Sequence, residues 1–318
     1  MAFYDVFNGD ADGLCALHQW RLAAPRDAVR ITGAKREIDL LGRIAGTVRA
    51  GDEIVVFDVS LERNRAALAA VLAAGARVRW FDHHQADGVL AHPHLDATID
   101  TAADICTSLL VNRRLEGRYR AWAVVAAFGD NLIAAAEAAA APLDLERQPV
   151  AQLRELGECL NYNAYGETVD DLHYHPLDLY AALQPYPDPL EFIAAEPVLE
   201  VLRAGRDDDL MRTTDLAPYA ERAACAAYVL PDAAWARRAS GVFANRLAHE
   251  HPLRAHAVLT ASGGGYRVSV RAPVADPREA AALCRAFGGG GRAGAAGIDA
   301  LPAADLDRFV AALAAHYA

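Results

Sequence analysis

Residues 3–22 read FYDVFNGDADGLCALHQWRL. The apolar run at 3–7 has the composition of a buried strand, and 13–22 has that of a helix. Asp10 and Asp12 stand between them, where the strand is expected to end. Because Gly13 permits a tight turn there, both carboxylates can point toward one hard cation or lie on either side of two.

The same alternation continues through the first half of the chain. We expect strands at 3–7, 29–32, 53–59 and 77–81, and helices at 13–22, 38–48, 61–74, 103–115 and 119–140. Strands that alternate with helices form parallel sheets with right-handed crossovers. The predicted fold class is therefore α/β, a mostly parallel sheet flanked by helices. Its loops at the carboxyl ends of the strands are where ligands of such sheets bind.

A chain of 318 residues is long enough for two compact domains. We expect a first α/β domain over 1–185 and a proline-interrupted helical linker over 186–235. A smaller C-terminal α/β domain should follow over 236–318. Within it we expect strands at 254–261 and 266–271, joined by the glycine-rich turn 262–265, and helices at 239–249, 277–287 and 303–316.

Composition restricts the class of partner. The net charge is −11 and the isoelectric point about 5.4, which argues against neutralising the phosphates of a long duplex nucleic acid. Short anionic substrates remain compatible, because bound cations reverse the local charge. The five scattered cysteines suggest buried thiols rather than a disulfide framework. The chain has no targeting pattern and no run of about 20 apolar residues, so we expect a cytoplasmic protein without a membrane partner.

Two further acidic motifs follow predicted strands. Asp58 ends the very apolar run 54–57, a place where an unpaired charge is costly. The triplet Asp82-His83-His84 follows the next strand, and imidazole together with carboxylate suits Mn²⁺, Fe²⁺ or Zn²⁺. Each motif alone also fits an ordinary turn or helix cap. Together they predict a metal site at the carboxyl edge of the sheet.

The motifs match a known family in order and spacing. The set Asp10-x-Asp12-Gly13, Phe57-Asp58, Phe81-Asp82-His83-His84 and Gly129-Asp130 resembles the four motifs of the DHH phosphoesterases. Ser269-Val270-Arg271 and the glycine-rich run 288–297 resemble the DHH-associated substrate-binding domain. The matched motifs span residues 8–297, which is nearly the whole chain.

The resemblance implies a two-domain enzyme that holds a pair of Mn²⁺ ions, with Mg²⁺ or Co²⁺ as alternatives. It implies the metal ligands Asp10, Asp12, Asp58, His83 and Asp130, with Asp58 bridging and also catalytic. His84 would contact the phosphate or protonate the leaving oxygen, and Asp82 would orient a histidine. The second domain would grip the substrate through Arg271, Gly289, Gly290, Gly291 and Arg292.

Two positions depart from the family pattern. Asn8 stands where many members carry His or Asp, and an amide is a poorer ligand for a transition metal. Asn8 is therefore expected to contact the metal ligands rather than the metal. The first metal site would then be weaker, shared with a substrate oxygen, or empty. Arg292 stands where the family often has His, which could alter the preferred end group of the substrate.

The predicted activity is hydrolysis of phosphoester bonds in short nucleotides by two-metal activation of water. Oligoribonucleotides attacked by an exonuclease-like enzyme, dinucleotides and bisphosphate nucleotides all fit. Lys35 and Arg36, near the predicted edge, would attract such anions. The alternatives are an inorganic pyrophosphatase or polyphosphatase, and a non-catalytic nucleotide or metal sensor. A homodimer stays open.

Overall fold

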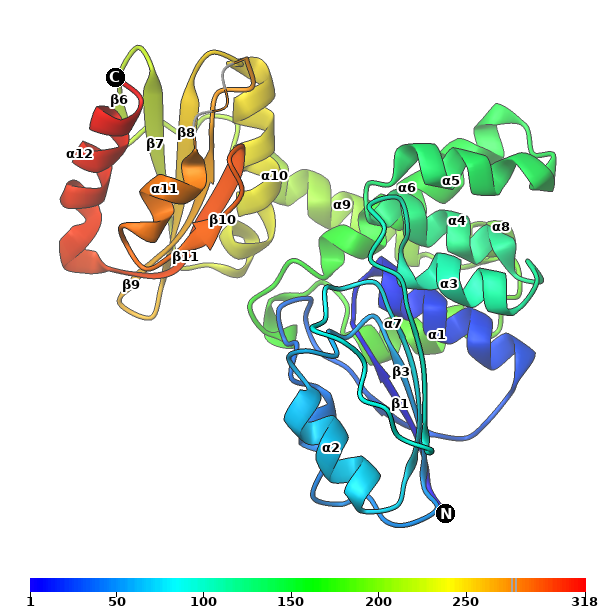
Figure 1. Ribbon diagram of the computed structural model, residues 1–318. Helices are drawn as coiled ribbons and strands as arrows, with labels where there is room; N and C mark the ends of the chain where they lie inside the picture. Colours follow the sequence, from blue (N-terminus) through cyan, green and yellow to red (C-terminus); the bar gives the residue numbers. More distant parts are fainter. Residues whose placement is uncertain (276, 278) are drawn as a thin grey trace. The chain divides into compact units, whose positions relative to one another are not determined.

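The chain forms two compact units, Met1–Gly205 and Arg206–Ala318, in a computed structural model that describes residues 1–275, 277 and 279–318 (Figure 1). The boundary falls within helix α9 (Val198–Met211). The range 186–235, expected as a helical linker, also holds strands β6 (Ala220–Glu221) and β7 (Cys225–Leu230). Strand β7 escaped prediction because its sequence CAAYVL is rich in alanine, which has a low preference for strands.

The first unit contains a five-stranded sheet in the order β2-β1-β3-β4-β5, with every neighbouring pair parallel. The strands are β1 (Phe3–Phe7), β2 (Val29–Ile31), β3 (Glu53–Phe57), β4 (Arg77–Asp82) and β5 (Leu95–Ile99). The predicted α/β class is confirmed. Strand β5 was not predicted, because this edge strand is only partly buried and lacks a strong apolar pattern.

Helices occupy most of the remaining first unit. They are α1 (Ala11–Ala23), α2 (Arg65–Ala73), α3 (Thr107–Arg114), α4 (Arg120–Gly129), α5 (Ile133–Ala140), α6 (Arg147–Asn163), α7 (Pro176–Leu183), α8 (Pro189–Ala195) and α9, with the 3-10 turns η1 (Leu41–Arg43), η2 (Ala141–Leu143) and η3 (Val169–Asp171).

Two helix predictions in the first unit were wrong. The range 38–48 forms only the short turn η1, where Asn64 accepts from the Leu41 amide and donates to the Ile38 carbonyl. Two glycines in this range also disfavour a helix. The range 119–140 is split into α4 and α5 at Asn131, whose φ of 60° is left-handed. This break places Asp130 at the end of a helix rather than inside one.

Both faces of the first sheet are buried, because alternate residues of each strand point to opposite sides. Phe7, Phe57 and Phe81 join the core that contains α1, α4 and α6. Val6, Val56 and Trp80 join the core that contains α2 on the other face. The layers fix the carboxyl ends of the strands, where the acidic motifs lie.

A close approach of three helices depends on glycine. A Cβ on Gly129 would lie 2.5 Å from the Ala11 Cβ, and one on Gly157 would lie 2.1 Å from the Val125 carbonyl oxygen. Any larger side chain would separate α4 from α1 and α6. Gly129 therefore brings Asp130 toward the start of α1.

The second unit is built on a six-stranded mixed sheet in the order β10-β11-β9-β8-β7-β6. Its other elements are α10 (Ala234–Glu250), β8 (Ala255–Ser262), β9 (Gly265–Arg271), α11 (Ala280–Arg285), β10 (Gly290–Gly291), β11 (Ala295–Pro302), η4 (Ala303–Asp305) and α12 (Leu306–His316). Helices α11 and α12 pack on one face and α10 on the other (Figure 1). The predicted hairpin is confirmed, with positive φ at Gly263 and Gly264. The predicted helix 277–287 includes residue 278, which lies outside the described residues.

All five cysteines are buried thiols without a disulfide partner, as the sequence suggested. Over the described ranges, no helix has the length and hydropathy needed to cross a bilayer.

Candidate metal centre

Asp10 caps the N-terminus of α1. Its Oδ1 accepts hydrogen bonds from the amides of Asp12 (3.1 Å) and Gly13 (3.0 Å). The Asn8 side-chain oxygen in turn accepts from the Asp10 amide at 3.3 Å. Helix amides stabilise a carboxylate in this position. The motif is therefore both a helix cap and a source of site carboxylates.

Asp12 is fixed by the N-terminus of α3. Its two carboxylate oxygens each accept a backbone hydrogen bond at 2.7 Å, from Thr107 and from Ser108. Sequence reasoning missed these two residues. The available signal was a Thr-Ser pair ahead of an apolar run, which is typical of a helix start. The contacts lock Asp12 in one orientation beneath the ends of the strands.

Asp58 follows β3 in a strained conformation. Its φ of 56° is left-handed, a region that non-glycine residues occupy at a cost. The Thr107 hydroxyl lies 3.3 Å from Asp58 Oδ1, and the Asp58 amide donates to the Phe81 carbonyl at 3.0 Å. The turn directs a buried carboxylate toward the other acidic residues.

His83 lies among these carboxylates. Its Nδ1 is 3.1 Å from the Ile105 carbonyl oxygen, which can only accept, so Nδ1 carries a proton and the neutral ring has its lone pair on Nε2. Nε2 lies 3.3 Å from Asp58 Oδ1, 3.8 Å from Asp130 Oδ2 and 4.0 Å from Asp12 Oδ2. This is the orientation that a histidine ligand of a metal requires.

Asp82 and His84 form a second, coupled pair. Asp82 Oδ1 lies 2.6 Å from His84 Nδ1 and accepts from the His84 amide at 3.1 Å. Its Oδ2 accepts from the Leu61 amide at 3.2 Å. Burial opposes the charged imidazole, but the Asp82 hydrogen bond and charge raise the pKa of His84 above its ordinary value. Asp82 thus holds the ring and favours its protonated form.

Lys35 enters the carboxylate cluster from the loop after β2. Its Nζ lies 2.6 Å from Asp10 Oδ2 and 3.5 Å from Asp130 Oδ1. Burial alone would lower the pKa of Lys35, but the charges of Asp10 and Asp130 raise it well above its ordinary value. The predicted anion-attracting lysine is therefore a charged partner of the site carboxylates.

The carboxylates perturb one another. Burial, followed by the charges of Asp10, Asp12 and Asp130, raises the pKa of Asp58 well above its ordinary value. Burial, followed by the charge of Asp12, raises the pKa of Asp130 to about 7. Carboxylates pressed together in this way favour either a proton or a cation between them.

Two groups of side chains in the described part of the chain have donor atoms placed to hold a metal ion. They are Asp12, His83 and Asp130, and Asp58, His83 and His84, with the donor atoms of each group within 4.8 Å of one another. Carboxylate oxygens with imidazole nitrogens suit Mn²⁺. The residues present therefore fit a divalent transition metal.

The predicted substrate-binding residues lie in the second unit. The Arg271 guanidinium donates to Asn245 Oδ1 (2.7 Å) and Ser269 Oγ (2.9 Å). The Gly289 amide donates to the Cys284 carbonyl at 2.9 Å and so is already used, while Gly290 and Gly291 form β10. The Arg292 amide closes a turn on the Ala295 carbonyl at 2.8 Å. Since Ala295 pairs with Arg271 across the sheet, this turn ends beside the end of β9.

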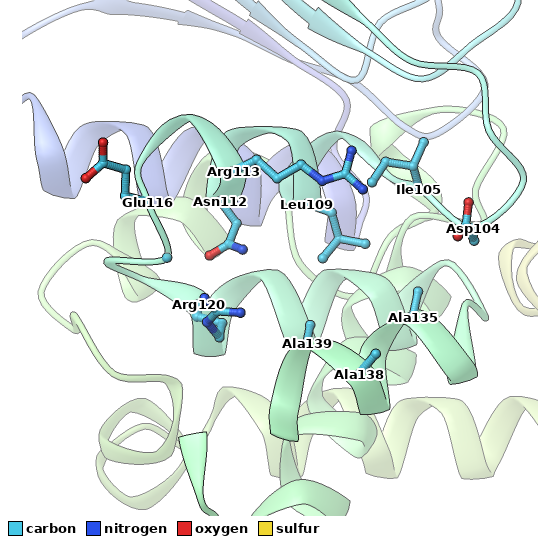
Figure 2. A pocket seen from close by; sticks show the side chains of 11 residues that line it. Asp104, Ile105, Leu109, Asn112, Arg113, Glu116, Arg120, Ala135, Ala138 and Ala139 are labelled. Atoms are coloured by element: carbon cyan, nitrogen blue, oxygen red, sulfur yellow. The ribbon is translucent and has the colours of Figure 1, made fainter. Parts of the chain in front are cut away.

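A cavity of about 590 Å³ lies between α3 and α5 (Figure 2). Its wall includes Asn112 and Arg113 from α3, Ala139 from α5, and Arg120 at the start of α4. None of the predicted site residues lines it. One residue of its wall, Ile105, also touches the centre, because its carbonyl oxygen lies 3.1 Å from His83 Nδ1.

Comparison with known proteins identifies solved structures of similar fold. No family model and no curated sequence matches the chain. Among solved structures, exonuclease RecJ bound to manganese superposes with a TM-score of 0.68 at 19% identity, covering 99% of this chain and 90% of that one. RecJ in complex with Mn²⁺ from Thermus thermophilus gives 0.67 at 18%, covering 99% of this chain but 52% of that one. The pGpG-specific phosphodiesterase PggH from Vibrio cholerae gives 0.56 at 14%, covering 99% of both chains. The predicted resemblance to DHH phosphoesterases is confirmed at the level of the fold.

Proposed function

We propose that this protein is a divalent-metal-dependent phosphoesterase that hydrolyses phosphoester bonds of short nucleotides. One observation carries the proposal. Asp12 at the start of α1, Asp58 after β3 and Asp130 at the end of α4 converge within 4.0 Å of His83 Nε2. A purely structural role gives no reason to crowd three carboxylates around a histidine held for ligation.

The substrate class rests on charge and on the structural neighbours. A net charge of −11 disfavours long polyanions. The neighbours include an exonuclease and a phosphodiesterase specific for the linear dinucleotide pGpG. A linear dinucleotide or the end of a short oligoribonucleotide satisfies both observations. We place such a substrate ahead of a bisphosphate nucleotide or an inorganic polyphosphate.

Each residue has a chemical task in this proposal. Divalent ions, when bound, supply Lewis acidity for water activation and neutralise phosphoryl charge. Asp12, Asp58, His83 and Asp130 would hold them. His84, whose protonated form Asp82 favours, would donate a hydrogen bond to the phosphate or a proton to the leaving oxygen. Arg271 and Arg292 of the second unit would bind a terminal phosphate or a base.

The test is turnover by metal-stripped protein after addition of Mn²⁺. The panel contains a linear dinucleotide, a short RNA, a cyclic dinucleotide, a bisphosphate nucleotide and pyrophosphate, with release of mononucleotide or phosphate as readout. We expect hydrolysis of the linear dinucleotide and the short RNA. Turnover of pyrophosphate alone would instead identify a pyrophosphatase, and Mn²⁺ binding without any turnover would identify a sensor.

A matched pair of variants tests the grip on the substrate. Arg292→Ala should raise KM by about 10- to 100-fold, the value of one charge-assisted hydrogen bond. Arg308→Ala, which removes an exposed guanidinium that pairs with Asp305 in the same unit, should leave KM unchanged. Equal effects of the two variants would remove Arg292 from the proposed site.

A further inference from the structure

Lys35 has the contacts of a resident cation. Its ammonium lies 2.6 Å from Asp10 Oδ2, 3.1 Å from Asn161 Oδ1 and 3.5 Å from Asp130 Oδ1. Three oxygen partners match the three N–H donors of an ammonium group. The Asn161 amide nitrogen donates to the Tyr165 hydroxyl at 2.8 Å, so its oxygen faces Lys35.

The loop around Lys35 is built to hold it there. The Lys35 amide donates to the Ala164 carbonyl at 3.2 Å, at the end of α6. The Asn8 side chain donates to the Lys35 carbonyl at 3.5 Å and accepts from the Asp10 amide. Both polar ends of Asn8 therefore serve to position Lys35 and Asp10.

Lys35 is also the only lysine in the chain. Of its 31 lysine and arginine residues, all others are arginine. A chain that otherwise uses only arginine keeps a lysine where the cation touches the site carboxylates. A compact ammonium can sit among several oxygens as a metal ion does, whereas the planar guanidinium fork is shaped for bidentate contact with one carboxylate.

Lys35 occupies the Asp10 oxygen that the helix amides leave open. Asp10 Oδ1 accepts two helix amides and Asp10 Oδ2 accepts Lys35. Consistent with this, neither group of candidate metal ligands found over the described residues includes Asp10. Both groups of candidate ligands contain His83.

On these grounds we propose that Lys35 takes the place of the first metal ion, so that the centre binds a single divalent cation through Asp12, Asp58, His83 and Asp130. The inference rests on the proposed metal-dependent function and changes its chemistry. Asp58 becomes an ordinary ligand instead of a bridge. The Lys35 ammonium supplies the fixed positive charge beside the phosphate that a second ion would otherwise supply.

The experiment counts Mn²⁺ ions in the full chain. Metal-stripped protein is titrated with Mn²⁺ by calorimetry, and the bound ion is examined by electron paramagnetic resonance. The wild type should bind one Mn²⁺ per chain with the hyperfine spectrum of an isolated ion. Lys35→Met, which keeps the length and removes the charge, should free Asp10 and Asp130 and bind two, with the spectrum of an exchange-coupled pair.

Two further variants serve as controls for the ion count. Lys35→Arg keeps the positive charge and should still bind one ion. Arg43→Met removes a cation from the same β2–β3 connection, where the guanidinium contacts Glu37 and the Thr32 carbonyl, and should bind one ion as well. If Lys35→Met does not fold, the count and spectrum of the wild type still test the proposal.

Two ions in the wild type, or an unchanged count of one in folded Lys35→Met, would overturn the inference, as would failure of the wild type to bind Mn²⁺. The count is separate from the activity test. Two coupled ions in an active enzyme would refute the role of Lys35 and leave the phosphoesterase intact. One ion in an inactive protein would support Lys35 and refute the enzyme.

Discussion

His83 Nε2 lies 3.3 Å from Asp58 Oδ1, although the two residues follow different strands, and the backbone of Asp58 is left-handed. Strain of this kind persists where surrounding structure enforces it, and it concentrates at functional sites. A substitution in this pair is therefore the most direct way to test catalysis separately from folding.

We expect Asp58→Asn to lower turnover by at least about 100-fold. This is more than the loss of activity usually seen when a residue that only hydrogen-bonds to a metal ligand is replaced. Asparagine tolerates the left-handed conformation, so the fold should survive. Circular dichroism and thermal unfolding would check this beside the kinetic assay. Full activity in a folded Asp58→Asn protein would rule out the proposed centre.

Asp82→Asn should separate positioning from metal binding. It removes the charge that holds His84 and favours its protonated form, so kcat should fall by about 10- to 100-fold. The alkaline limb of the pH–rate profile should shift to lower pH, because the imidazolium loses its partner. Mn²⁺ stoichiometry, measured by calorimetry, should not change. A variant that lost its metal instead would make Asp82 part of the binding site.

The metal-free protein should lose stability as pH rises. Folding raises the pKa of the Asp130 carboxyl from 3.8 to about 7, so the folded state holds this proton more tightly. Its contribution is complete below the unfolded value and is lost as pH rises through about 7. Unfolding temperatures between about pH 5 and pH 8 should show the decline, and added Mn²⁺ should oppose it at high pH. Asp130→Asn should flatten the profile, and an unchanged slope would assign the effect elsewhere.

A buried ion pair should contribute to the stability of the second unit. Arg238 donates to Asp209 through Nε (2.7 Å) and Nη2 (2.9 Å), and both side chains are nearly inaccessible. Asp209→Ala leaves a buried guanidinium and should cost about 3–5 kcal/mol. The double variant with Asp209→Leu and Arg238→Met should recover most of this loss. Denaturant unfolding measures both, and a double variant as unstable as the single one would contradict the assignment.

Local pattern accounts for most of the sheet and for the identity of the acidic motifs. The strands β1, β3 and β4 are short apolar runs, and acidic residues stand at or just after the end of each. The hydrophobic period and the turn residues are therefore enough to predict them. The break at Asn131 and the strand β7 were not readable in this way. A left-handed residue and an alanine-rich strand are selected by packing against distant elements rather than by local preference.

The sequence by itself determined that Asp10, Asp12, Asp58 and His83 are candidates for one edge of a parallel sheet, because right-handed crossovers leave few other arrangements. Asp130 was added only by the family resemblance, since its position lay inside a predicted helix. Only the tertiary structure decided which residues contact them. Lys35 meets Asp10 across 25 residues and Asn161 across 126. The carbonyl that fixes the His83 tautomer comes from Ile105, on the loop before α3. Such contacts join segments that are far apart in the sequence, and no short motif records the distance between them.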